Sequence, residues 1–257
     1  MMLLIVGRSG TGKDALAREL AKYGLTQLKS HTTRAKRSED EDTHVFITEE
    51  DAAAIPVKIA KTERNGHEYF ATPEQVAKSD VYIVDPNGVF DMAEQCPNEV
   101  FRVAYIRADR LERRIHAVNR AEKPIQEEKI FEQREEDENS TFKEFEDIIQ
   151  DGVSALPPNV TALYNIENDY EPATMADAAE FLINEKRLHE NMLKVIDILI
   201  KHDFIEADAE NPDMLKDVIE RDGNTVSVTK KHYAEVLLSS QDAFDSVMRQ
   251  YLRIVEL

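Results

Sequence analysis

The residues at the start of this chain limit its fold more than any other stretch. Residues 1–6 are all apolar, which predicts a buried strand. They are followed by GRSGTGKD, which contains the spacing G-x-x-x-x-G-K, and by an amphipathic segment that ends at Gly24. In a strand, glycine-rich turn and helix of this kind, backbone N–H groups surround a phosphate at the helix N-terminus. The pattern therefore predicts an α/β fold with a polyphosphate site.

This turn, which we call the glycine-rich loop (residues 7–14), has residue types suited to a nucleotide. Its glycines lack the Cβ that hinders positive φ, and Lys13 supplies a mobile charge for the outer phosphates. Asp14 stands where the motif has a hydroxyl for Mg²⁺, so strong Mg²⁺ dependence is expected. An ordinary turn with a surface lysine is the alternative. The predicted ligands of ATP and Mg²⁺ are Gly7, Arg8, Ser9, Gly10, Thr11, Gly12, Lys13 and, on the metal, Asp14.

Composition excludes several classes of protein. The chain has 257 residues and a formal net charge of -19, which argues against a nucleic-acid backbone or an anionic membrane as partner. The single cysteine, Cys96, excludes an internal disulfide and a cysteine-based zinc site. No stretch is apolar enough to cross a bilayer, and no basic flank precedes residues 1–6, so a cytoplasmic location is expected.

A second phosphate-directed pattern lies in SHTTRAKR, residues 30–37. Arg34 and Arg37 follow hydroxyl residues and precede the acidic residues 38–42. Because a guanidinium offers a planar fork of donors that matches phosphate oxygens, the two arginines predict a pocket for a second phosphate. A solvated basic turn is the alternative.

Together, the two patterns resemble the guanylate kinase family of nucleoside monophosphate kinases. The resemblance rests on the glycine-rich loop, S-x-T-T-R-x-x-R, an acidic turn and the short aromatic strand HVFI, and it covers about residues 2–188. It implies a three-layer α/β/α P-loop fold with a central parallel sheet, a small mixed-β acceptor-binding insertion and a helical lid. It also implies that Ser30, Arg34 and Arg37 bind the acceptor nucleotide, with the arginines on its phosphate.

The resemblance extends to further residues of the insertion. Thr72 matches a residue that contacts the base, but TPEQ at residues 72–75 is also a capping box, and both roles stay open. His44 replaces a phosphate-contacting tyrosine, and Phe70 replaces a second one, whose hydroxyl is lost or passed to Tyr69. Three residues lie near the place of the family's guanine-reading glutamate: Lys61, Glu63 and Glu68.

Two polar residues end predicted strands. The strand VYIVD ends in Asp85, which the resemblance aligns with the second acid of an Asp-x-Asp pair. It is predicted to hold Mg²⁺ through water or to contact the acceptor, with a plain strand-end acid as the alternative. Asn168 follows the last predicted strand, residues 160–166, and matches an asparagine near the adenine of ATP.

An arginine-rich, strongly charged helical hairpin follows the strand predicted at residues 101–106. The resemblance implies a lid that brings cations to the phosphoryl group and excludes water. Position favours Arg114, Arg120 and Arg134 for this role. The alternative is a solvated face on which these arginines pair with the neighbouring glutamates.

The expected organisation is a guanylate kinase-like domain at residues 1–188 and a helical extension at residues 189–257. Within the domain, the core is expected at residues 1–30, 80–110 and 140–188, the insertion at 31–79 and the lid at 111–139. A helix break is predicted near residue 189, and Asn211-Pro212 is predicted to open another helix. The extension shows no catalytic pattern and is expected to pack on the core or on a second subunit, which would make a homo-oligomer.

These patterns predict transfer of the γ-phosphoryl group of Mg·ATP to a nucleoside monophosphate, GMP or dGMP by resemblance. The residues expected to neutralise the transferred charge are Lys13, Arg34, Arg37, Arg114, Arg120 and Arg134. One alternative is another small phosphorylated acceptor, such as a different deoxynucleotide or a ribose bisphosphate. The other is a non-catalytic binding module with a guanylate kinase-like fold.

Overall fold

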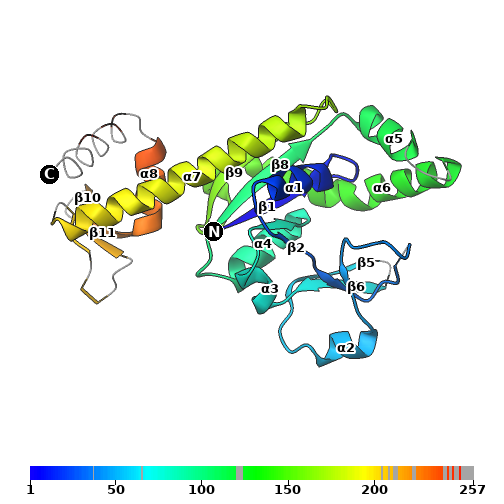
Figure 1. The fold of residues 1–257 in the computed structure, drawn as a ribbon, viewed down its shortest axis with the longest axis horizontal. Coiled ribbons are helices and arrows are strands. Elements are labelled where there is room, and N and C mark those ends of the chain that lie inside the picture. The colour runs from blue at the N-terminus through cyan, green and yellow to red at the C-terminus, as the bar shows by residue number, and fades with distance from the viewer. Residues whose placement is uncertain are drawn as a thin grey trace. The chain divides into compact units, whose positions relative to one another are not determined.

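The structure is a computed structural model, and it forms two compact units, Met1–Glu180 and Phe181–Leu257 (Figure 1). It describes residues 1–36, 38–64, 66–119, 124–203, 205–207, 209–210, 214–221 and 224–239, together with residues 242, 245 and 249. The boundary between the units falls inside α7 (Thr174–Lys201), which is one helix although the sequence predicted a break near residue 189.

The first unit is built on a five-stranded sheet in the order β2-β7-β1-β8-β9, in which every pairing is parallel. Five of the six residues of the central strand are buried, which explains its uninterrupted apolar sequence. This sheet confirms the predicted α/β class. The strands are β1 (Met2–Gly7), β2 (Gln27–Leu28), β7 (Val81–Ile83), β8 (Phe101–Arg107) and β9 (Val160–Glu167).

Helices cover both faces of this sheet. On one face, α4 (Pro86–Gln95) and α6 (Pro124–Ile149) pack in a single apolar cluster with Leu4 and Val6. Ile5 is also buried but lies outside that cluster, because successive side chains of a strand point to opposite faces. The other face is covered by α1 (Lys13–Lys22), which contacts β1 and β7. The layers are therefore α/β/α, as predicted.

The predicted insertion is a separate four-stranded mixed sheet in the order β4-β3-β6-β5. Strands β3 and β4 pair in parallel, and the other pairs are antiparallel. The Asn-Gly turn between β5 and β6 was predicted from sequence, but its Asn65 lies outside the described residues. The elements are β3 (His31–Thr32), β4 (Val45–Phe46), α2 (Glu49–Ala54), β5 (Ile59–Arg64), β6 (His67–Ala71) and α3 (Pro73–Ala77).

The charged hairpin consists of α5 (Arg110–Asn119) and the first part of α6, which contact each other. The lid is predicted from sequence to end at residue 139 and the core to resume at residue 140, but α6 runs without a break through this boundary to Ile149. A short 3-10 helix, η1 (Val153–Ala155), connects α6 toward β9. One continuous helix therefore carries both residues predicted for the lid and residues of the apolar core.

The second unit contains most of α7, β10 (Met214–Arg221), β11 (Asn224–Thr229) and α8 (Lys230–Ser239). The prediction of an all-helical extension is wrong, because β10 and β11 form an antiparallel hairpin. Alternating β-branched residues in NTVSVT favour a strand, and this outweighs the helix start predicted at Asn211-Pro212, which lies outside the described residues. The small core consists of Met192, Val195, Ile196, Leu199, Leu215, Ala234 and Leu237.

None of the helices in the described part of the chain combines the length and the apolar character that crossing a bilayer requires.

Candidate functional site

A cavity of about 740 Å³ lies where the glycine-rich loop, the insertion, the end of β7 and α6 meet. Parallel strands place their carboxyl ends at one edge of a sheet, and ligands of open α/β folds bind outside that edge. The lining therefore combines residues that are far apart in sequence. Its polar and charged members include Ser9, Lys13, Asp14, Ser30, Arg34, Glu41, His44, Arg64, Tyr69, Asp85, Arg134 and Glu138.

The glycine-rich loop has the shape of a polyphosphate cradle. Gly10 and Gly12 have φ values of 85° and 97°, which L side chains rarely adopt. A Cβ on Gly7 would lie 2.6 Å from the Ile106 carbonyl oxygen, and one on Gly12 would lie 2.7 Å from Asn168 Nδ2. Glycine is required at these positions for the loop to close at the start of α1. The helix N-terminus then faces the site, as anion binding requires.

Lys13 is enclosed by the loop that it serves. Its Nζ donates to the carbonyl oxygens of Gly7, at 2.6 Å, and Arg8, at 2.9 Å. Burial lowers the pKa of Lys13 to about 8, although the negative charges of Glu138 and Asp14 oppose this shift. The ammonium therefore keeps its charge at neutral pH and can turn from the carbonyl oxygens to phosphate oxygens.

Two residues that follow β9 hold the loop from the other side. Asn168 Nδ2 donates to the Thr11 carbonyl oxygen at 2.9 Å, and the Tyr170 hydroxyl donates to the Gly10 carbonyl oxygen at 2.7 Å. Asn168 is buried and also accepts a bond from the Tyr170 backbone. These bonds give Asn168 a structural role at the loop, and its adenine contact stays a prediction.

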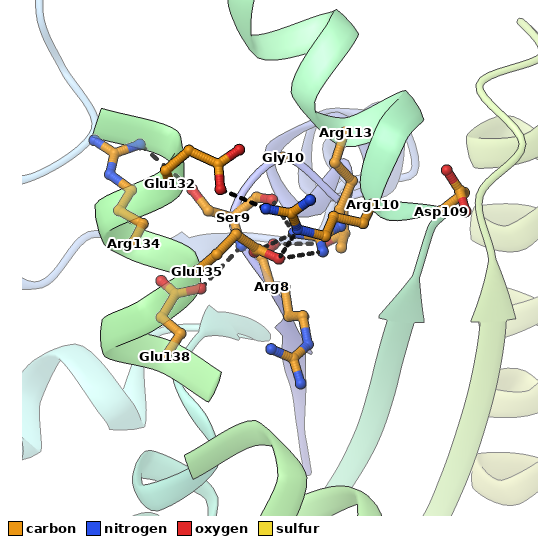
Figure 2. A network of polar contacts seen from close by, with 12 residues as sticks. Arg8, Ser9, Gly10, Asp109, Arg110, Arg113, Glu132, Arg134, Glu135 and Glu138 are labelled. Atoms are coloured by element: carbon orange, nitrogen blue, oxygen red, sulfur yellow. Dashed lines mark hydrogen bonds and ion pairs between the residues drawn. The ribbon is translucent and has the colours of Figure 1, made fainter. Parts of the chain in front are cut away.

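Arg113 is a site residue that sequence reasoning missed. Its Nη1 donates to the Ser9 carbonyl oxygen at 3.0 Å, and its two Nη atoms form bonds of 2.6 and 2.8 Å to the Glu135 carboxylate (Figure 2). Arg113 is buried, and it shares the inner face of α5 with Ala117. No local pattern singled it out, because Leu111 and Ile115 of the same helix also lie four residues apart and yet are exposed. The Arg113 pair joins α5, α6 and the loop.

On the acceptor side, the predicted cluster assembles with partners of its own. Ser30 Oγ lies 3.0 Å from His44 Nδ1, and the Tyr69 ring meets the His44 ring edge-on at 5.4 Å. Arg34 forms bonds of 2.7 and 3.2 Å to the two carboxylate oxygens of Glu41, and these bonds raise the pKa of Arg34. The structure therefore places four predicted residues around one cavity, with Arg34 paired to an acid.

The structure does not place the other two residues predicted to bind the acceptor, Thr72 and Arg37, at the cavity. Thr72 caps α3, because its Oγ1 accepts from the Gln75 backbone at 3.4 Å and Gln75 Oε1 accepts from the Thr72 backbone at 3.0 Å. Thr72 is not among the described residues that line the cavity. Of the two roles left open by the sequence, the structure shows the cap, and the base contact stays a prediction. Arg37 lies outside the described residues.

The two predicted Mg²⁺ ligands both line the cavity. Asp14 is exposed in the first turn of α1, and Asp85 caps α4 by accepting from the Gly88 backbone at 2.8 Å. The described residues contain no group of three or more His, Cys, Asp or Glu side chains that could hold a metal alone. This arrangement fits Mg²⁺, which commonly binds through one or two carboxylates, phosphate oxygens and water.

Only one of the predicted lid arginines is described at the loop. Arg134 Nη1 donates to Ser9 Oγ at 3.4 Å and lines the cavity (Figure 2). Arg114 instead pairs with Glu128 and does not belong to the described lining. Arg120 lies outside the described residues. Arg134 therefore lies at the cavity, and its role in a lid stays a prediction.

Arg64 and Glu138 complete the lining, and sequence reasoning missed both. Arg64 ends β5 and donates to Asp85 at 3.2 Å and to Glu138 at 3.4 Å. Glu138 lies on α6, where its Oε2 accepts from the Ser9 backbone N–H at 3.2 Å. Neither belongs to a local motif, so only the folded arrangement brings them to the site.

No family model matches this chain, and no curated protein matches it. Among solved structures, a crystal structure of guanylate kinase from Anaplasma phagocytophilum is similar with a TM-score of 0.44 and 16% sequence identity. The match covers 73% of this chain and 84% of that chain.

Proposed function

We propose that this protein is a nucleoside monophosphate kinase that transfers the γ-phosphoryl group of ATP to the phosphate of GMP or dGMP. One observation carries the proposal: a single cavity is lined both by the glycine-rich loop with Lys13 and by Ser30, Arg34, His44 and Tyr69. The first group suits a polyphosphate and the second a phosphorylated acceptor. Two phosphate-directed sites with one shared cavity favour group transfer between them.

The chemistry asks the protein for position and charge. Phosphoryl transfer proceeds in line between two anions, so catalysis comes from holding them in register and neutralising the charge on the transferred group. Loop N–H groups and Lys13 would hold the donor phosphates, and Arg34 the acceptor phosphate. Arg134 would approach the transferred group from α6. Mg²⁺, held by Asp14 and Asp85 with the phosphates, would screen the charge of both substrates.

The Arg34–Glu41 pair adds a condition. A bound acceptor phosphate must share Arg34 with Glu41 or displace it, because a guanidinium forms its strongest bonds through paired donors. Both side chains are largely buried, at 14% and 11% exposed, so Glu41 also fixes the direction of Arg34. The arginine of the proposed acceptor site is therefore already oriented, but it is paired with a carboxylate that the acceptor phosphate must compete with.

The test is an acceptor panel with Mg·ATP and release of ADP as the readout. GMP and dGMP are expected to give the highest turnover among GMP, dGMP, AMP, CMP, dTMP and ribose bisphosphate. Lys13→Met is expected to lower turnover by about 10²–10³-fold, the usual effect of removing one charge-stabilising donor. Lys22→Met is the matched control, because Lys22 lies at the exposed end of the same helix and pairs with Glu19.

The panel can also reject the proposal. If no acceptor raises ADP release above the rate without acceptor, the kinase proposal is rejected, and if no ADP is released at all, a binding module is left. Preference for AMP, a pyrimidine nucleotide or a ribose bisphosphate would keep the kinase and reject GMP as its acceptor.

A further inference from the structure

Arg64 connects three elements across the mouth of the cavity. It is the last residue of β5 in the insertion, and its guanidinium donates to Asp85, at the start of α4, and to Glu138, on α6. Its side chain is 48% exposed, whereas those of Asp85 and Glu138 are 19% and 12% exposed. The half-exposed Arg64 guanidinium is therefore held at the site by two carboxylates that are largely buried.

Glu138 occupies a position that a phosphate would use. Its Oε2 accepts from the Ser9 backbone N–H, one of the groups that the glycine-rich loop offers to an anion (Figure 2). This N–H therefore donates to a carboxylate of the protein itself. A phosphate that takes the same N–H must displace that carboxylate.

The charges that line the cavity make a further cation necessary. Among the described lining residues, the acids outnumber the bases, although the proposed substrates are themselves polyanions. The lining acids are Asp14, Glu41, Glu63, Asp85, Asp137 and Glu138, and the lining bases are Lys13, Arg34, Arg64 and Arg134. Arg34 is already bound to Glu41 through two bonds. Arg64 is the more exposed of these two arginines and the easier one to redirect.

We propose that Arg64 is a polyphosphate-binding residue of this cavity and that Glu138 occupies the loop until the polyphosphate displaces it. The inference deepens the proposed function and rests on it. Once Glu138 leaves Ser9, Arg64 loses one of its carboxylates and can offer two parallel N–H donors to a phosphate. Asp85 retains the Gly88 backbone as a partner.

The exchange is energetically accessible. Ion pairs with a half-exposed member contribute little to stability, so breaking the Arg64 pairs costs little. A doubly charged phosphate then replaces a singly charged carboxylate at both Ser9 and Arg64. Binding of the polyphosphate would break the Arg64–Glu138 contact, which joins the insertion to α6. Glu138 therefore competes with the ligand for both Ser9 and Arg64.

The experiment measures binding of inorganic tripolyphosphate by titration calorimetry on the full chain, with no nucleotide present. Arg64→Gln is expected to weaken binding about tenfold or more, because it removes a charged pair of donors. Glu138→Gln is expected to tighten binding about three- to tenfold, because it removes the competing charge next to the loop. Arg18→Gln, on the exposed side of α1 and outside the cavity lining, is the control and is expected to match the parent.

Opposite signs for the two variants separate this proposal from a structural role, which would weaken binding in both. Affinity of Arg64→Gln equal to that of the parent overturns the role of Arg64, and weaker binding by Glu138→Gln overturns the competition. Arg64→Lys, which keeps the charge, is expected to fall between Gln and parent and replaces the Gln variant if that variant unfolds. A parent that binds tripolyphosphate yet phosphorylates no acceptor rejects the proposed kinase alone, whereas a parent that binds no tripolyphosphate rejects both.

Discussion

The two sides of the cavity differ in how their phosphate-binding groups are held. On the donor side, Arg113, Asn168 and Tyr170 all bond to carbonyl oxygens of the glycine-rich loop, which leaves the loop's shape fixed. On the acceptor side, Arg34 is bound to Glu41, and Ser30 to His44. The backbone of the glycine-rich loop is thus held in its shape, although Glu138 must leave the Ser9 N–H, whereas on the other side Arg34 itself must exchange its partner. We therefore expect substitutions to act differently on the two sides.

The largest effect is expected at Gly12. Gly12→Ala combines a strained φ of 97° with a Cβ 2.7 Å from Asn168 Nδ2, so we expect ATP binding to weaken by about 100-fold or more. Gly24→Ala is the control, because Gly24 has a φ of 86° but nothing within 4 Å of an added Cβ. It should cost about 1 kcal/mol of stability and leave ATP binding intact. Calorimetry with ATP measures the affinity of both variants. An equal loss of affinity in both would show that ATP binding does not depend on the fixed shape of the glycine-rich loop.

The next effect concerns the buried Arg113–Glu135 pair. Arg113→Met removes the two close bonds to the Glu135 carboxylate and leaves it the longer contact of 3.6 Å to Arg110, so the free energy of unfolding should fall by about 3 kcal/mol, measured by urea denaturation. The double variant with Glu135→Met should recover part of that loss, since it removes the poorly compensated charge. Arg110→Met, whose side chain is 56% exposed, removes only the longer contact to Glu135 and the pair with Glu132 and should change stability little. If Arg113→Met is as stable as the parent, the Arg113–Glu135 pair does not stabilise the fold.

A pH effect is expected on the donor side alone. The pKa of Lys13 is lowered to about 8, so the free site loses its ammonium above that pH while the phosphate-bound site favours the charged form. Affinity for ATP should therefore fall by about fivefold from pH 8 to pH 9. Lys13→Arg keeps its charge over this range and should give a nearly flat profile. Equal slopes for parent and variant would assign the titration to another group.

The smallest effect is expected on the acceptor side. Glu41→Gln frees Arg34 from its competing carboxylate, and we expect the KM for GMP to fall about three- to tenfold with the KM for ATP unchanged. Asp42→Gln is the control, because Asp42 pairs with the exposed Lys29 and does not line the cavity. A rise in the KM for GMP would mean that Glu41 orients Arg34 more than it competes, and the contrast between the two sides would weaken.

Sequence reasoning succeeded where the information is local. The buried strand, glycine-rich loop and helix follow one another within the first part of the chain, so their pattern predicts both fold and site. The hairpin of the insertion, β5 with β6, joins neighbouring segments of the chain and is likewise local. The central parallel sheet was expected from the resemblance to the guanylate kinase family and is present.

What sequence reasoning missed depends on contacts between distant segments. Arg113 reaches the loop across 104 residues, and Glu138 reaches Ser9 across 129. Side chains in charged helices give no local sign of which one turns inward. The β10–β11 hairpin was missed for another reason, because a helix-start signal was weighed above β-branched alternation in the next segment. The extent of α6 was also underestimated.

The continuity of α6 has a mechanical consequence. A helix of 26 residues is about 39 Å long and behaves as a stiff rod, with Phe142 and Phe145 anchored in the apolar core at one end and Arg134 and Glu138 reaching the loop farther along. A continuous helix that is packed in the core at one end cannot bend in its middle without breaking backbone hydrogen bonds. Any widening of the cavity at α6 would then require the whole helix to tilt, and the packing of Phe142 and Phe145 in the core would help to set how fast the cavity opens.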